Sequence, residues 1–221
     1  YCIQDFTRQD IIGFLRVWYE NIELAAADET KEEEAKEKSR EAAEELIKLV
    51  EDDSYKTLQH LAVNPLLLTI IVLIHRWQAV LPKERHLLYE RALKTMLELW
   101  RIAKGFMQTF SYETSLDKLS ILADQLTIAN TRELTKKEIV GLLGETIEGK
   151  KTAVFLDEMI RNAGLLYESE GQYGFIHLTF QEYLTAYQYA NTKEAIDILQ
   201  YRDKSYWNES FKLFFNMGHV N

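Results

Sequence analysis

The sequence of 221 residues contains little cysteine, proline or glycine, and each shortage excludes a class of protein. The single cysteine, Cys2, cannot form an intramolecular disulfide or build a cysteine-based metal site. Two prolines and nine glycines, beside 47% hydrophobic and 12% aromatic residues, are not the composition of a linker or a disordered tail. We therefore expect an ordered, helix-rich globular protein from a reducing, cytoplasmic compartment.

Long hydrophobic runs are also missing. The most apolar run, 66–74, ends in His75 and Arg76, and it is far shorter than the roughly 20 residues that a membrane-spanning helix needs. No signal-peptide pattern leads the chain. Because the first residue is Tyr1 rather than Met, we expect a piece of a longer protein. The sequence predicts no membrane partner.

Positive charge is in deficit, with 26 Lys and Arg against 35 Asp and Glu, a net charge of -9 and a pI of about 5.2. Such a chain repels a phosphate backbone, so we expect no nucleic-acid partner. Scattered hydroxyls and a lone cysteine predict no nucleophilic catalytic site. Four histidines without metal-ligand spacing are interpreted as surface or packing residues, namely His60, His75, His86 and His219.

Helical patterns fill the first half of the chain. Thr7 is placed to open a capping box at the start of a first helix. Residues 28–53 are dense in Glu and Lys around one narrow apolar stripe, which is typical of a helix with a solvated outer face. Asn64 can cap a later helix with Pro65 at its first position. That helix is apolar nearly all round, so we expect it to be buried.

The second half predicts three helices, a β-hairpin and a closing helix. Helices over 115–129, from Thr135 and over 152–162 precede two short β-prone runs, 165–168 and 173–176. Three helices followed by such a ribbon is the order of a winged helix. The predicted fold class is therefore mainly α, with a helical bundle followed by a winged-helix domain that carries a small β-hairpin wing.

The closing helix follows the ribbon in the stretch GFIHLTFQEYLTA (174–186). Thr179 opens a second predicted capping box, which places His177 just outside a helix N-terminus. From spacing alone, His177 is either a structural histidine packed at a strand–helix seam or a functional group presented there. Three aromatic residues at helical spacing are predicted to be core, namely Tyr183, Tyr187 and Tyr189.

Three segments together resemble, in order and spacing, the C-terminal half of the NACHT-type signal-transduction ATPases, which are NLR-like members of the STAND class. They are NPLLLT (64–69), LPKER (81–85) with Leu88 and Tyr89 after it, and FIHLTFQEY (175–183). The Phe-x-His-x-x-Phe-Gln-Glu run within the last segment is the most specific of them. The resemblance covers most of the chain.

The resemblance implies a domain organisation: helical domain 1 over 1–105, a winged-helix domain over 106–190 and the start of a second helical domain over 191–221. The Gly-x-x-x-x-Gly-Lys-Ser/Thr phosphate loop is missing, as is an acidic strand end that would hold magnesium. We therefore expect that this chain is not an enzyme by itself and completes no cofactor site alone. The intact parent is expected to be a slow ATPase that binds ATP or ADP with Mg²⁺.

The resemblance also implies a nucleotide-dependent switch in defence signalling, including innate immunity and antiviral defence, or in stress signalling. In this family the nucleotide lies between the ATPase core and these helical domains, ADP holds them closed, and activation lets the core oligomerise. Pro65 is implied to pack against the adenine, and His177 to donate to the β-phosphate. The implied partners are the N-terminal nucleotide-binding core of the same polypeptide, effector and sensor domains, and further copies of the parent.

Two other functions remain open from the sequence. A winged helix often binds DNA, but its third helix here offers Asp157 and Glu158 against the single Arg161. A weak basic edge is formed by Lys136, Lys137, Lys150 and Lys151. The other alternative is a nucleotide-independent protein-interaction module, in which Pro65 is only a good first-turn residue and His177 only a packing residue.

Overall fold

A computed structural model of the chain describes residues 5–27, 31–78, 81–99, 109–191 and 195–218. These residues are mainly helical with small antiparallel sheets, which confirms the predicted fold class. The chain divides into two compact units, unit 1 (Tyr1–Ala92) and unit 2 (Leu93–Asn221). The boundary predicted between residues 105 and 106 lies outside the described residues. None of the described helices has the length and apolar character needed to cross a bilayer.

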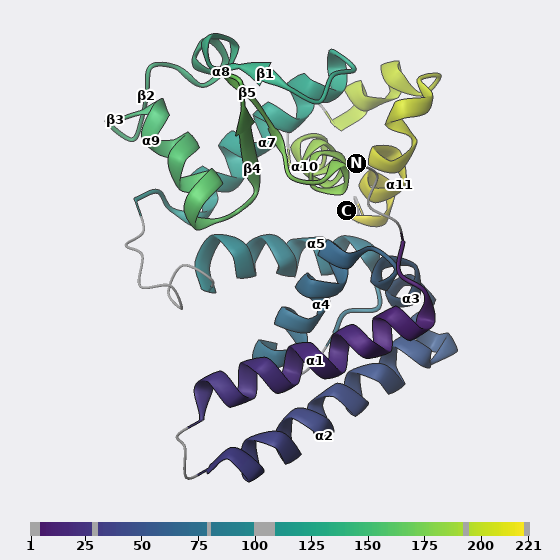
Figure 1. The fold of residues 1–221 in the computed structure, drawn as a ribbon. Helices are drawn as coiled ribbons and strands as arrows, with labels where there is room; N and C mark the ends of the chain where they lie inside the picture. Colours follow the sequence, from purple (N-terminus) through teal and green to yellow (C-terminus); the bar gives the residue numbers. More distant parts are fainter. Residues whose placement is uncertain (1–4, 28–30, 79–80, 100–108, 192–194, 219–221) are drawn as a thin grey trace. The chain divides into compact units, whose positions relative to one another are not determined.

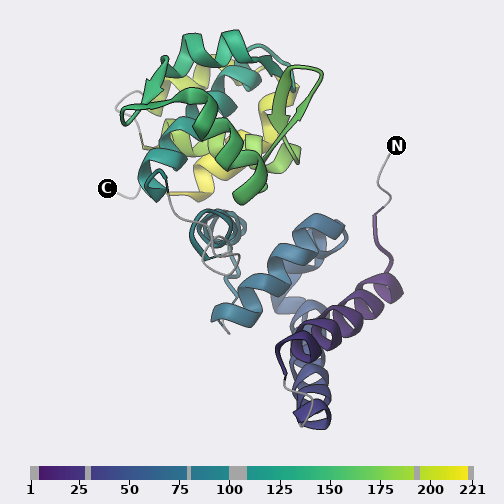
Figure 2. The same cartoon turned by 60° about the vertical axis from the view of Figure 1, so that its left-hand side comes forward.

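Unit 1 is a bundle of helices, in which α1 and α2 lie side by side as an antiparallel pair (Figures 1 and 2). Its elements are α1 (Arg8–Ala26), α2 (Glu32–Glu51), the short 3-10 helix η2 (Asp53–Tyr55), α3 (Lys56–Ala62) and α4 (Pro65–Gln78). The helix α5 (Arg85–Lys94) carries the chain from unit 1 into unit 2.

The predicted caps form at the starts of α1 and α4. The Thr7 hydroxyl accepts the Asp10 N–H at 3.3 Å, and the Asp10 carboxylate accepts the Thr7 N–H at 2.8 Å, which completes a capping box. The Asn64 side-chain oxygen accepts the Leu67 N–H at 3.1 Å. Pro65 is the first residue of α4, where its missing N–H leaves no bond unmade.

The core of unit 1 is mostly apolar, and its buried polar side chains among the described residues are Ser39 and His75. Large side chains that are almost completely buried there include Leu15, Tyr19, Leu46, Leu58, Leu68, Ile71 and Ile74. The Tyr19 hydroxyl lies 2.6 Å from Nδ1 of His75 on α4. Charged side chains of α2 stay in solvent and form ion pairs such as Arg16–Glu44. The prediction of a narrow apolar stripe with a solvated outer face is therefore confirmed for α2.

Unit 2 has the order of elements that the sequence predicts for a winged helix. The π-helical turn η3 (Thr95–Leu99) is followed by α7 (Tyr112–Ile128), β1 (Leu134–Thr135), α8 (Lys136–Leu143), β2 (Thr146–Ile147), β3 (Lys150–Lys151), α9 (Thr152–Asp157) and its π-helical continuation η4 (Glu158–Asn162). The rest comprises β4 (Leu166–Ser169), β5 (Gln172–Phe175), α10 (Leu178–Ala190), the 3-10 helices η5 (Ala195–Tyr201) and η6 (Ser205–Trp207), and α11 (Asn208–Asn216).

The wing is the hairpin of β4 and β5, and β1 adds a third strand in the order β1-β5-β4. Its two-residue turn has positive φ at Glu170 (53°) and Gly171 (78°), the conformation whose twist matches an antiparallel hairpin. The pairing of β2 with β3 adds a second small hairpin. The sequence analysis missed β1, β2 and β3, because two-residue strands carry no alternating pattern.

Two helix starts in unit 2 test the sequence analysis. The helix predicted from Thr135 is confirmed as α8, and Thr135 and Glu138 form a capping box at its start, which the Thr-x-x-Glu pattern of 135–138 also indicates. The preceding helix, however, begins at Tyr112 rather than at Ser115, because the Ser111 hydroxyl accepts the Thr114 N–H at 3.0 Å and caps it one turn earlier. Two of the three tyrosines predicted for the core, Tyr183 and Tyr189, are buried, and Tyr187 is half-buried.

Candidate functional site

His177 forms the junction between the wing and α10. The Ile176 N–H donates to the Leu165 carbonyl at 3.0 Å, which extends the pairing of the hairpin one residue beyond β5. The helix begins immediately afterwards at Leu178, so His177 itself is the N-cap, and its Nδ1 accepts the Thr179 N–H at 3.3 Å. The predicted cap at Thr179 is wrong, because Thr179 lies inside the first turn of the helix.

Thr179 fixes which nitrogen of the imidazole carries the proton. A backbone N–H can only donate, so Nδ1 of His177 acts as the acceptor, and the Thr179 hydroxyl also lies 2.8 Å from it. Burial and, secondly, the positive charge of Arg132 lower the pKa of His177 below its ordinary value. At neutral pH the ring is therefore neutral and carries its proton on Nε2.

Positive potential gathers around this ring. The start of α10 presents backbone N–H groups and the positive end of the helix dipole, which favours an anion by about 0.3–1 kcal/mol. Arg132, in the loop between α7 and β1, adds a full charge close enough to His177 to lower its pKa. A Cβ on Gly174 would lie 2.5 Å from the Arg132 carbonyl oxygen and 2.9 Å from the Tyr167 ring. Only glycine lets this loop approach the wing so closely.

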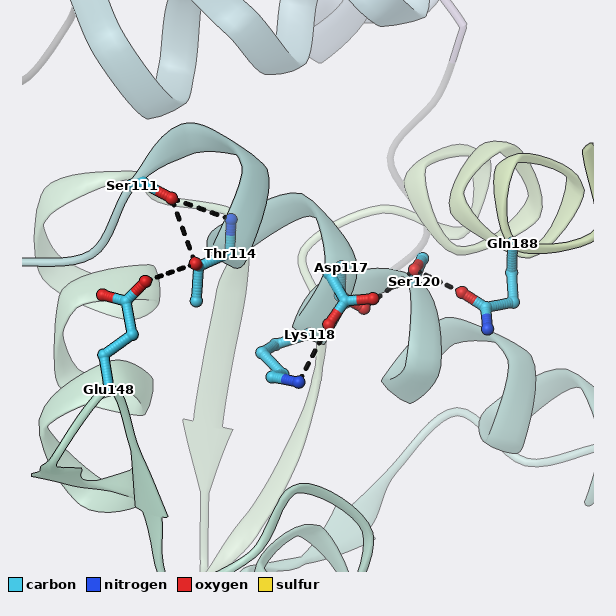
Figure 3. A network of polar contacts seen from close by, with 7 residues as sticks. All are labelled: Ser111, Thr114, Asp117, Lys118, Ser120, Glu148 and Gln188. Carbon is cyan, nitrogen blue, oxygen red and sulfur yellow. Dashed lines mark hydrogen bonds and ion pairs between the residues drawn. The ribbon is translucent and has the colours of Figure 1, made fainter. Parts of the chain in front are cut away.

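A row of hydrogen bonds fixes α10 against α7. The Ser120 hydroxyl donates to the Gln188 side chain at 2.6 Å (Figure 3). The hydroxyls of Thr127 and Thr185 lie 2.9 Å apart in the buried seam. The Gln181 amide donates to the Thr127 hydroxyl at 3.1 Å. Because breaking a buried hydrogen bond is costly, α10 is held in one register along α7.

The first turn of α7 is tied to the small β2–β3 hairpin (Figure 3). The hydroxyl of Thr114 donates to the Glu148 carboxylate at 2.5 Å, and Glu148 lies in the hairpin turn with a φ of 50°. The Ser111 cap lies beside the same contact. The helix α7 is thus anchored by the hairpin at its start and by α10 along its length.

Pro65 and His177 belong to different units, so each is described by its own surroundings. Pro65 is half-buried at the start of α4, and its carbonyl accepts the Thr69 hydroxyl at 2.9 Å. Within unit 1, the position of Pro65 is fully explained by its suitability for a first helical turn. Part of its ring remains exposed at the helix start.

The other histidines are placed as surface or packing residues in the described parts of the chain. His75 is buried, His86 is half-buried and His60 is exposed, whereas His219 lies outside the described residues. Among the described residues, no group of three or more His, Cys, Asp or Glu side chains could hold a metal ion.

The third helix of the winged helix carries mixed charge. The Arg161 guanidinium lies 2.6 Å from the Asp157 carboxylate, so the cation of this helix is paired within the helix itself. Glu158 is buried. The lysines of the predicted basic edge are all exposed, namely Lys136, Lys137, Lys150 and Lys151. The third helix itself, with Asp157 and Glu158 against Arg161, therefore offers no net positive charge to a phosphate backbone.

Sequence reasoning missed Arg132 and the polar seam. Arg132 follows the end of α7 in a loop with no periodic pattern, and the loop reaches the wing through the pairing of β1 with β5 and the close approach at Gly174. The seam is visible in the sequence as a polar pattern. Ser120, Asp124 and Thr127 are spaced by four and three residues, so they share one face of α7. A polar stripe inside an otherwise buried helix is a feature that sequence inspection can find.

Comparison with known proteins adds one family. A search of curated proteins gave no significant match. Residues 85–189 match the family described as "Winged helix-turn-helix domain C-terminal to NACHT". The matched segment runs from the start of α5 to near the end of α10, and so includes the three-stranded sheet and His177. Residues 85–189 are therefore a winged-helix domain of the family that lies C-terminal to NACHT.

Proposed function

We propose that this chain is the nucleotide-sensing regulatory region of a NACHT-type signal-transduction ATPase. It clamps ADP or ATP, with Mg²⁺, against the nucleotide-binding core of the same polypeptide and gates oligomerisation in defence or stress signalling. The observation that carries the proposal is the Nε2–H tautomer of His177 at the start of α10, beside Arg132. The family match supports it, because a NACHT association implies a nucleotide-binding parent.

A phosphate oxygen is the kind of group that fits this arrangement. The neutral ring of His177 offers an N–H donor, the start of α10 adds backbone N–H groups, and Arg132 adds positive charge. We assign the β-phosphate to His177. When bound, the nucleotide and its Mg²⁺ supply the phosphoryl chemistry at the core, whereas residues of this chain bind and orient it.

Pro65 is the second proposed contact. Its half-buried ring is a flat apolar surface at a helix start, on which a purine can lie. Pro65→Ala keeps a good helix former at the first position but removes the ring. In the intact parent we expect weaker binding of ADP with little change in the helix content of unit 1.

The test for His177 uses the intact parent protein. Replacing His177 with Ala removes the N–H donor, and a lost hydrogen bond to a charged group should weaken ADP binding by roughly ten- to a hundredfold. Loss of the ADP-bound closed state should also raise the fraction of oligomer formed without a signal. Isothermal titration calorimetry and size-exclusion chromatography measure the two effects.

His177→Asn is the matched variant, because Asn is a strong N-cap but places no donor where Nε2 lies. It should preserve the stability of α10 and still weaken ADP binding. Unchanged ADP affinity and unchanged basal oligomerisation in both variants would remove the proposal. Tight DNA binding that falls steeply with salt would instead favour the DNA-binding function.

A further inference from the structure

A cluster of aromatic rings fastens the segment after α10 to the winged helix. The rings of Tyr201 and Trp207 stack with their centroids 4.1 Å apart and 4° between their planes. Tyr189, near the end of α10, meets Trp207 edge-on at 5.7 Å and Tyr201 at 6.5 Å. Trp207 is completely buried. These rings hold η5, η6 and the start of α11 against α10.

A carboxyl group of α7 is bonded to this cluster. The Asp124 side chain hydrogen-bonds with the Tyr189 hydroxyl, and Tyr189 also bonds with Tyr201. A hydroxyl has one proton to donate, so Tyr189 donates to the carboxylate and accepts from Tyr201. The Asp124 Oδ1 atom is shielded from solvent and has no hydrogen-bond partner among the described residues. The carboxylate is therefore poorly stabilised where it lies.

The titratable neighbours of Asp124 come from each element packed against α7. Tyr189 comes from α10, and Tyr201 from η5 reaches Asp124 through Tyr189. Charged residues of the other packed elements are the half-buried Glu98 of η3 and the exposed Lys136, Lys137 and Glu138 of α8. On α7 itself, the nearest charged pair is Asp117 with Lys118, at 2.8 Å. Burial is the main influence on Asp124, and it raises the pKa of the carboxyl to about 6.

We propose that Asp124, Tyr189 and Tyr201 form a proton-dependent latch, which sets how firmly residues 195–216 are held to the winged helix. When Asp124 is protonated, a neutral carboxyl occupies the shielded site and the segment is held firmly. When Asp124 is ionised, a poorly solvated negative charge lies in the seam and the segment detaches more readily. The latch joins α7 to two later elements, α10 and η5, that follow it by about 50 residues or more.

The direction of the pH effect follows from the raised pKa. The stabilising effect of protonated Asp124 on the held segment is fully present below the ordinary carboxyl pKa of 3.8. It is lost as the pH rises through about 6. Proton linkage over this interval predicts that the equilibrium for holding the segment weakens by up to about tenfold between roughly pH 5 and pH 7. At neutral pH the segment is therefore held less firmly to the winged helix than at acid pH.

The test is hydrogen exchange of the 221-residue chain, followed by mass spectrometry from pH 5 to pH 7.5. After correction for the intrinsic exchange rate, protection of amides in η5 and α11 should fall by up to about tenfold across this range. Asp124→Asn keeps the shape of the side chain and removes its charge. It should raise protection at neutral pH and abolish the pH dependence.

Asp117→Asn is the matched control, because Asp117 is exposed on the same helix, and it should leave the pH dependence unchanged. Tyr201→Phe keeps the ring on Trp207 but removes the hydroxyl, so it should lower protection at all pH values and retain the slope. If the Asp124→Asn chain does not fold, loss of the pH dependence in Tyr201→Phe would contradict the latch, because this variant keeps the Asp124 carboxyl. A wild-type protection that does not vary with pH, or a slope that survives in Asp124→Asn, overturns the latch. The hydrogen-exchange experiment requires no nucleotide. Failure of the latch is therefore distinct from failure of the proposed function.

Discussion

The two units bury their polar groups in different ways. In unit 1, the buried polar side chains among the described residues are Ser39, whose hydroxyl donates to the Lys36 carbonyl at 2.7 Å, and His75, whose ring lies 2.6 Å from the Tyr19 hydroxyl. In unit 2, a row of polar side chains follows the seam between α7 and α10, from Ser120 through Thr127, with the partly shielded carboxyl of Asp124 between them. The two buried polar side chains of unit 1 therefore have short-range partners, whereas the seam of unit 2 contains a carboxyl group whose pKa is raised by burial to about 6.

His75 of unit 1 and His177 of unit 2 also differ in their surroundings. Burial lowers the pKa of both His75 and His177. His75 is 6% exposed, and its other neighbour is the Glu45 carboxylate at 3.9 Å. His177 is half-buried at a helix start beside Arg132. The burial of His75 is that of a core residue, whereas the position of His177 is that of a group able to meet an anion.

The largest effect should come from removing a core aromatic ring in unit 2. Phe155 is fully buried and meets Phe110 edge-to-face at 5.4 Å. Phe155→Ala should lower the free energy of unfolding by about 3–5 kcal/mol, because it leaves a cavity. Urea denaturation followed by circular dichroism measures the loss. The neighbouring Val154 is 43% exposed, and a comparable loss in Val154→Ala would contradict the assigned core.

A smaller effect should follow from breaking the buried pair of unit 1. Tyr19→Phe removes the hydroxyl and leaves a buried ring nitrogen of His75 without its partner, at a cost of about 1–3 kcal/mol. The matched variant in unit 2 is Tyr167→Phe, whose hydroxyl donates to the exposed Glu133 carboxylate at 2.7 Å and should matter much less. Equal losses in urea denaturation would remove the distinction between buried and exposed tyrosine bonds.

Helix caps should contribute about equally in the two units. Asn64→Ala in unit 1 and Ser111→Ala in unit 2 each remove a side-chain acceptor from a helix start. Each should cost about 1 kcal/mol in the free energy of unfolding. Replacing each of these residues with Gly should cost only a few tenths of a kcal/mol, because Gly is itself tolerated at the N-cap position. The glycine variants therefore serve as controls for the two alanine variants. A negligible loss in either alanine variant would show that solvent replaces that cap.

The last prediction is a pH dependence of amide protection that has opposite sign in the two units. The pKa of His75 is lowered from its ordinary value of 6.5, so its contribution is fully present above that value and is lost as the pH falls below it. Protection of α4 amides should therefore decrease toward acid pH, and His75→Gln should flatten this slope. The latch at Asp124 predicts the reverse for α11, where protection should increase toward acid pH. Protection that changes in the same direction with pH in α4 and in α11 would contradict the opposite charge behaviour of His75 and Asp124.

The sequence predicted the local features of the fold more completely than those of the site. The capping boxes at Thr7 and Thr135 and the wing hairpin were all found from short patterns, because each is made by residues within a few positions of one another. The cap of α10 was misplaced, because Thr is a far commoner cap than His. His177 was identified through a motif, and its role, like that of Pro65, stays a prediction.

The order of the longer helices and of the two wing strands could be read from the sequence, since caps, turns and apolar periodicity act over one or two turns of chain. Only the tertiary structure decided which polar groups meet. Arg132 is brought to the wing by the pairing of β1 with β5 and the close approach at Gly174, and Asp124 of α7 reaches Tyr201 through Tyr189 of α10. The physical reason is that burial and hydrogen bonding set the charge state of a side chain, and both depend on segments distant in sequence.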